Sequence, residues 1–97
     1  MEYSSPESCR FSLARTVDIS EGGLLMHVPE KLVIGQNLKA RLYYDASSGI
    51  DCVELLGEVI RSDRLGKSGK EYWCAVRFVN LSSEIMNNLR TLLDSLY

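Results

Sequence analysis

The chain has few of the histidine and cysteine residues from which many catalytic and metal centres are built. It has a single histidine and three cysteines, which are far apart and include no Cys-x-x-Cys pair. A structural zinc site needs about four such ligands at short spacing, so the sequence excludes one. An odd number of dispersed cysteines predicts reduced thiols that serve packing, as in cytosolic proteins, and not a disulfide framework.

Long apolar runs and a positive net charge are missing as well. No stretch approaches the roughly 18 consecutive apolar residues of a membrane span, and the N-terminus has neither the basic nor the apolar segment of a signal peptide. The formal net charge is −2, which argues against broad binding to DNA or RNA. We therefore expect a soluble, cytoplasmic domain with no membrane insertion and no nucleic-acid partner.

What the chain does have is the composition of one small globular domain, which we expect to span residues 1–97. Hydrophobic residues make up 45% and charged residues 25% of the 97 positions, enough for one core but not for a large internal cavity. Residues 2–4 read as the end of a first strand. Residues 11–19 then alternate with period two, which predicts a half-buried strand with Phe11, Leu13, Val17 and Ile19 on its inner face.

Four later segments alternate in the same way. Their predicted inner faces are Leu24, Met26 and Val28; Leu38, Ala40, Leu42 and Tyr44; Val53, Leu55, Gly57 and Val59; and Tyr72, Cys74, Val76 and Phe78. Within the third of these segments, Gly57 is predicted to mark a bulge or a bend of the sheet.

From residue 81 onward the period changes to that of a helix. Ser82 is the expected N-cap, and one apolar stripe follows at Ile85, Leu89, Leu92, Leu93 and Leu96. Short strands followed by one terminal helix predict a mainly β fold: a small antiparallel six-stranded (five to six) β-barrel with a C-terminal α-helix over residues 81–97.

No arrangement of residues indicates an enzyme. His27 has no catalytic partner in sequence. Glu54 and Glu58 would lie roughly 13 Å apart on a strand, beyond the range of about 5–9.5 Å for paired carboxylates. The segment 66–70 resembles a phosphate loop only superficially, because Arg61 stands where the first glycine of that motif is required. We expect a solvated hairpin there.

The turn between residues 18 and 23 is the strongest candidate for a site. It combines the carboxylate of Asp18, the hydroxyl of Ser20 and the paired glycines Gly22 and Gly23 between two apolar strands. Such a turn exposes backbone N–H groups and lets a ligand approach the main chain. Composition alone favours a simple hairpin closure, and the ligand-binding alternative stays open.

Set in this order of elements, the turn resembles the (D/N)xSxxG signature of PilZ domains, with Asp18, Ser20 and Gly23 in the motif positions. Residues 57–61 and 72–78 are similar to a middle strand and to the last strand of that family. The junction at residues 81–82 and the amphipathic helix are similar to its C-terminal element. The resemblance covers nearly the whole chain.

The resemblance implies a regulatory domain that binds cyclic di-GMP, a bacterial second messenger, and passes the signal to an attached domain or partner protein. It implies no enzyme activity and no cofactor. By the same resemblance Asp18 and Ser20 make polar contacts to the ligand, and Gly23 permits its close approach. Arg61, at the end of its strand, is the most plausible remaining basic contact.

The sequence departs from the family at a second motif, RxxxR, which clamps the phosphates and stacks on guanine. The arginines that precede the turn are Arg10 and Arg15, five positions apart and within the predicted strand, so neither is assigned to the clamp. The missing arginines would lie just before Met1. The chain is then either a piece of a longer protein or a variant without the clamp.

Loss of the clamp predicts weak binding. At roughly 1.5–3 kcal/mol for each hydrogen bond to a charged group, two arginines are worth about 3–6 kcal/mol, or a factor of about 10² to 10⁴ in affinity. We expect weak or undetectable binding by these 97 residues. One alternative is a PilZ-like protein–protein interaction or homodimerisation module that does not bind the nucleotide. A second is a small flavin- or nucleotide-binding barrel enzyme.

Overall fold

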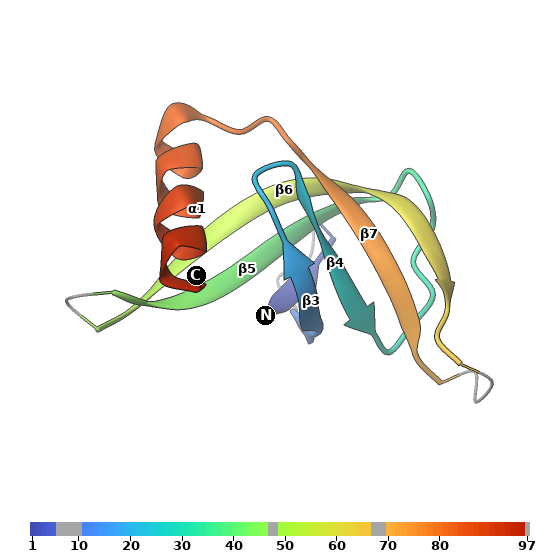
Figure 1. The fold of residues 1–97 in the computed structure, drawn as a ribbon. Helices are drawn as coiled ribbons and strands as arrows, with labels where there is room; N and C mark the ends of the chain where they lie inside the picture. Colours follow the sequence, from blue (N-terminus) through green and yellow to red (C-terminus); the bar gives the residue numbers. More distant parts are fainter. Residues whose placement is uncertain (6–10, 47–48, 67–69, 97) are drawn as a thin grey trace.

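The computed structural model describes residues 1–5, 11–46, 49–66 and 70–96. Within these residues, seven strands are followed by one helix (Figure 1). In chain order the elements are β1 (Glu2–Ser4), β2 (Ser12–Leu13), β3 (Arg15–Ile19), β4 (Gly23–Val28), β5 (Asn37–Ala46), β6 (Gly49–Arg64), β7 (Tyr72–Val79) and α1 (Ser83–Leu96).

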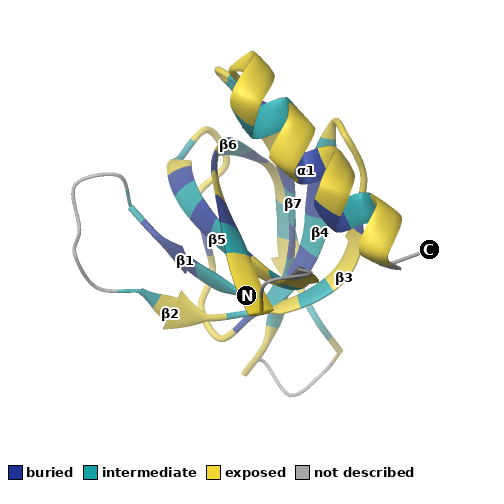
Figure 2. Cartoon of the chain, turned by 90° about the vertical axis from the view of Figure 1, so that its left-hand side faces the viewer, coloured by how far each residue is buried: buried dark blue, intermediate teal, exposed yellow. Residues whose placement is uncertain are grey.

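All seven strands form one antiparallel sheet in the order β2-β1-β5-β6-β7-β4-β3. Its two edge strands, β2 and β3, are consecutive in sequence and separated only by Ala14, whose N–H donates to the carbonyl of Met1 at 3.0 Å. The sheet therefore curves until its edges meet at Ala14 (Figure 2). The predicted mainly β class, antiparallel pairing and terminal helix are confirmed. The strand count is seven, and no strand pair among the described residues closes the sheet into a barrel.

The core fills the concave side of this sheet, and α1 covers one end of it (Figure 2). The predicted inner faces of β4, β5, β6 and β7 are confirmed, with side chains such as Met26, Leu55 and Cys74 at most 1% exposed. Leu89 and Leu92 of the helix stripe are fully buried against them. The described residues contain no helix long and apolar enough to cross a membrane.

The helix begins as its sequence predicts. The hydroxyl of Ser82 accepts a hydrogen bond from the N–H of Ile85 at 3.1 Å, and the carbonyl of Ser82 accepts one from Met86 at 2.9 Å. Ser82 is thus the N-cap, which supplies a partner for an N–H group that the first turn of a helix leaves free.

The prediction of one inner face for residues 11–19 is wrong at Leu13 and Val17, which are 76% and 47% exposed. The segment is broken at Ala14, and a β-bulge lies at Val17, where the pairing of β3 with β4 shifts register. An extra residue in a strand moves the following side chains to the other face. Thr16 before the bulge and Ile19 after it therefore both face inward, and Ile19 is 6% exposed.

A second bulge lies in β6, at Ile60 and not at the predicted Gly57. The register between β6 and β7 shifts between Val59 and Arg61, so Val59 is buried while Arg61 lies on the outer face. Gly57 has a different role, because a Cβ there would lie 2.3 Å from Cγ1 of Val76. The glycine lets the side chain of β7 pack against the backbone of β6.

The bulge at Val17 can be tested by truncating two residues of the same parity. We expect Ile19→Ala to lower the free energy of unfolding by about 2–5 kcal/mol, as for other buried aliphatic side chains. Val17→Ala should lower it by less than about 1 kcal/mol, because this side chain is largely exposed. Urea unfolding followed by tryptophan fluorescence measures both. Equal losses would show an uninterrupted strand.

Candidate functional site

The turn between β3 and β4 is closed by the main chain and the hydroxyl of Ser20. The N–H of Ser20 donates to the carbonyl of Gly23 at 2.9 Å, and the N–H of Gly22 donates to Ser20 Oγ at 3.3 Å. The hydroxyl in turn lies 3.4 Å from the carbonyl oxygen of Gly23. Ser20 is exposed, so its oxygen both orders the turn and faces solvent, where a ligand can reach it.

The two acidic residues of the turn have separate partners. Asp18 is exposed, and its Oδ1 accepts a hydrogen bond from the N–H of Ile19 at 2.9 Å. Glu21, at the tip, accepts a hydrogen bond from Nε of Arg90 in α1 at 3.1 Å. The turn is therefore connected by an exposed ion pair to the helix that ends the chain.

Gly23 lies directly against the main chain of β7. A Cβ on this residue would overlap the carbonyl oxygen of Val76, so any side chain here would force the backbone to shift. Its neighbour Gly22 has open space around it, with the nearest atom, Ser20 Oγ, at 4.0 Å, and its carbonyl accepts a hydrogen bond from the N–H of Phe78 at 3.0 Å. The absent side chain of Gly23 thus serves strand packing.

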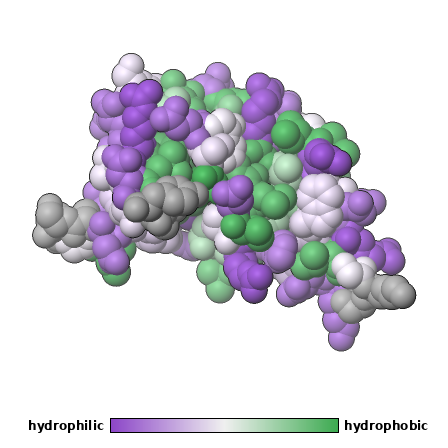
Figure 3. Space-filling model, viewed as in Figure 1, coloured by the Kyte–Doolittle hydropathy of each residue, from purple (hydrophilic) through white to green (hydrophobic). Residues whose placement is uncertain are grey.

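The turn opens onto a shallow surface groove of about 310 Å³ on the outer face of the sheet. Its lining comes from the turn and from β3, β4, β6 and β7: Asp18, Ile19, Ser20, Gly22, Gly23, Leu24, Leu25, Ile60, Ala75, Val76 and Arg77. In the same view as Figure 1, apolar side chains gather in the middle of this side of the molecule with polar ones around them (Figure 3). Such a surface suits a flat ligand with charged edges.

Arg61 lies on the same outer face as Asp18 but outside the groove. The strand pairings form one row across the sheet, with Asp18 opposite Leu25, Leu25 opposite Ala75 and Ala75 opposite Arg61. Three strand spacings separate the Cα atoms of Asp18 and Arg61 by about 14 Å. The guanidinium of Arg61 stacks over the ring of Trp73, 5.5 Å from its centroid.

Arg77 is a groove residue that no sequence motif indicates. It is paired directly with Gly23 across β4 and β7, and its Nη2 lies 3.1 Å from Oε1 of Glu58 in β6. It is the only cation that lines the groove within the described part of the chain. The alternation of β7 in the sequence shows that Arg77 faces outward. Its alignment with Gly23, however, depends on a pairing between segments that are distant in sequence.

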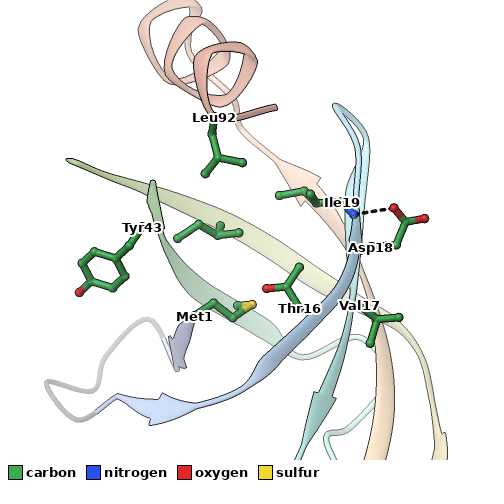
Figure 4. A pocket seen from close by; sticks show the side chains of 8 residues that line it. Met1, Thr16, Val17, Asp18, Ile19, Tyr43 and Leu92 are labelled. Atoms are coloured by element: carbon green, nitrogen blue, oxygen red, sulfur yellow. Dashed lines mark hydrogen bonds between the residues drawn. The ribbon is translucent and has the colours of Figure 1, made fainter. Parts of the chain in front are cut away.

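A second cavity lies on the other side of β3. It encloses about 390 Å³ between β3, β5 and α1. Figure 4 shows Ile19 and Leu92 pointing into it, whereas Asp18 points to the opposite side of the strand. The cavity is mainly apolar; Thr16 and Tyr43 are polar residues of its lining, but among the described residues no arginine or lysine lines it. The motif side chains therefore define the candidate site.

Other predicted chemistry can be checked within the described residues. No group of three or more histidine, cysteine or acidic side chains could hold a metal ion. Burial raises the pKa of the Cys74 thiol to about 11, which makes this cysteine a packing residue as expected. Arg10 and residues 67–69 of the predicted hairpin lie outside the described residues, and Leu65 and Glu71 pair at the base of that hairpin through an N–H···O bond of 2.8 Å.

Comparison with known families identifies the class. The sequence model of the PilZ domain matches residues 5–95, and the chain therefore belongs to the PilZ family. PilZ domains are non-enzymatic binding domains, which confirms that no enzyme activity is to be expected, and membership implies a regulatory domain for cyclic di-GMP. A search of curated proteins found no match to this chain.

The packing role of Gly23 predicts a difference between two adjacent glycines. Gly23→Ala should lower the free energy of unfolding by about 1–3 kcal/mol or more, because the new methyl group forces β4 away from β7. Gly22→Ala is the matched control and should be nearly neutral, since it has open space around it. Thermal or urea unfolding of both variants provides the measurement. A neutral Gly23→Ala would contradict this account of the motif glycine.

Proposed function

We propose that residues 1–97 form one PilZ domain that binds cyclic di-GMP in the groove at the Asp18–Gly23 turn. The observation that carries the proposal is the convergence of an exposed carboxylate, an exposed hydroxyl and an arginine around one apolar groove on the outer face of the sheet. A cyclic dinucleotide has flat apolar bases and two phosphates, and this combination of surfaces matches it.

In this proposal the turn residues contact the ligand and Arg61 extends the site. The hydroxyl of Ser20 donates to a phosphate oxygen, and Asp18 accepts from a guanine edge, since its Oδ1 already faces a backbone N–H and the carboxylate has further acceptor sites. Gly23 holds the turn against β7. Arg61, stacked on Trp73 in the same row as Asp18, presents a cation and an aromatic ring to the far end of the ligand.

The affinity we propose is low. The described residues contain no pair of arginines arranged as RxxxR, and the groove has one lining cation, which already has a carboxylate partner. This arginine must first leave its carboxylate partner, so it contributes less than the two free arginines of an RxxxR clamp. Residues 1–97 would therefore respond only to high concentrations of the nucleotide.

The regulatory output would pass through α1. The only ion pair between the turn and the helix among the described residues joins Glu21 and Arg90. A ligand bound at the turn changes the position of Glu21 and the field around Arg90. The helix would then transmit the change to an attached domain or a partner protein.

The direct test is an NMR titration of the ¹⁵N-labelled protein with cyclic di-GMP up to low-millimolar concentration. We expect the largest shifts at Asp18–Gly23 and an affinity weaker by about tenfold or more in Ser20→Ala, because a hydrogen bond to phosphate is lost. Ser83→Ala, which removes an exposed hydroxyl at the start of α1, is the control. Equal affinity in Ser20→Ala and wild type would contradict the proposed site. Low-micromolar binding measured by calorimetry would contradict the proposed weak affinity.

A second candidate function is a protein-interaction module that forms homodimers without the nucleotide. One observation favours it: of the residues of β5, β1 pairs with Lys39, Ala40 and Arg41 alone. Beyond that point, residues 42–45 of β5 have no strand partner on this side among the described residues. An unpaired antiparallel edge can pair with its own copy about a two-fold axis, and Tyr43 beside it is 50% exposed.

Under this second candidate, light scattering at rising protein concentration should show the mass increasing toward twice that of the monomer. Tyr43→Lys should reduce the dimer, because a charge on an edge strand opposes pairing. Ile34→Lys is the control, since Ile34 is 64% exposed in a turn far from that edge. A strict monomer at high concentration would eliminate the candidate.

A further inference from the structure

Three arginines of the sheet and helix are each bonded to a glutamate across the surface. The pairs are Arg41 with Glu54, Arg77 with Glu58 and Arg90 with Glu21, all with N···O distances of 3.1 Å. Exposed pairs of this kind shift an equilibrium only by a factor of about 1.5 to 5. They are therefore easily exchanged for a better anion.

Only one of these arginines lines the groove at the motif turn. Arg77 lies opposite Gly23 in the pairing of β4 with β7, and its side chain is 57% exposed. Glu58, its partner, lies opposite it on β6 and is 36% exposed. The carboxylate of Glu58 is thus bonded to the guanidinium of Arg77 next to the turn. This is the guanidinium that would otherwise be free to bind a phosphate in the groove.

We propose that Arg77 is the phosphate-binding cation of this groove and that Glu58 is an internal competitor which the ligand must displace. The inference rests on the proposed binding of cyclic di-GMP and adds to it a residue from β7 and a built-in limit on affinity. A phosphate oxygen replaces the Glu58 carboxylate on the guanidinium. The displaced carboxylate turns to solvent, which its partial exposure allows.

The exchange is favourable because of the geometry of the two anions. A guanidinium binds phosphate through two parallel N–H donors, whereas Glu58 makes one contact, to Nη2. The turn adds the Ser20 hydroxyl on the same phosphate, so the ligand gains several contacts when the carboxylate leaves. Removing the charge of Glu58 should then strengthen binding, an effect that a merely structural ion pair would not give.

The chain supplies a matched control on the same strand. Glu54 also lies on the outer face of β6, four positions before Glu58, and is bonded at the same 3.1 Å to Arg41 of β5. Neither Glu54 nor Arg41 lines the groove. Glu54→Gln and Glu58→Gln therefore remove the same charge from the same strand and break the same kind of pair, but only Glu58→Gln frees an arginine that lines the groove. Arg41 also stacks on the ring of Phe11, 4.0 Å from its centroid.

The experiment is an NMR titration of wild type, Glu58→Gln, Glu54→Gln, Arg77→Met and Ser20→Ala with cyclic di-GMP. Glu58→Gln should bind about twofold to fivefold more tightly and Arg77→Met about 10- to 100-fold more weakly, whereas Glu54→Gln should match wild type. Thermal melting checks that Arg77→Met is folded, and the gain in Glu58→Gln cannot arise from misfolding.

The outcomes separate this inference from the proposed function. If wild type binds and Ser20→Ala binds more weakly, but the variants of Arg77 and Glu58 equal wild type, the inference is overturned and the binding site stands. Equal gains in affinity in Glu54→Gln and Glu58→Gln would show that the effect comes from net charge alone, and would also overturn the inference. If neither wild type nor Glu58→Gln binds at low-millimolar ligand, both proposals are eliminated.

Discussion

The close contact between the backbones of β4 and β7 at Gly23 sets the arrangement of the whole outer face. No side chain fits between Gly23 and the carbonyl of Val76, and the adjacent Gly22 carbonyl is held by the N–H of Phe78. These contacts fix the turn against β7 in one register. Because Arg77 is the pairing partner of Gly23, the same contact brings a cation beside the motif hydroxyl. A glycine in a binding motif is often attributed to ligand access; here it is first a packing requirement.

Two β-bulges then decide which side chains face the ligand side of the sheet. The bulge at Val17 lets Thr16 and Ile19 both face the core while Asp18 between them remains outside. The bulge at Ile60 moves Arg61 to the outer face, whereas an unbroken alternation from Val59 would direct it inward. Bulges commonly redirect side chains next to functional sites. In this sheet each of them lies directly beside a residue of the proposed site.

These features also separate what the sequence could predict from what it could not. Period-two alternation identifies the inner faces of β4 to β7, and the Ser82 cap and apolar stripe identify the helix, because each of these signals is local. The bulges were missed because one inserted residue leaves the composition of a strand unchanged while it reverses the facing of everything after it. Val17 is apolar and has the expected parity, so nothing in the sequence indicates the bulge there. Strand number and closure depend on pairings between distant segments, which no local pattern contains.

The same distinction applies within the candidate site. Asp18, Ser20 and Gly23 are adjacent in sequence and form a recognisable motif, whereas Arg77 and Glu58 enter only through the pairing of β4 with β7 and of β7 with β6. The distribution of charge around the turn follows from the same strand pairing. The charge of Arg77 is balanced by Glu58 and that of Arg90 by Glu21, so the face around the turn has little net positive potential with which to attract an anion from a distance. Selection of the ligand must then come from short-range contacts made after the ligand has reached the surface. A phosphate that binds both the Arg77 guanidinium and the Ser20 hydroxyl replaces the Glu58 carboxylate, which binds the guanidinium alone.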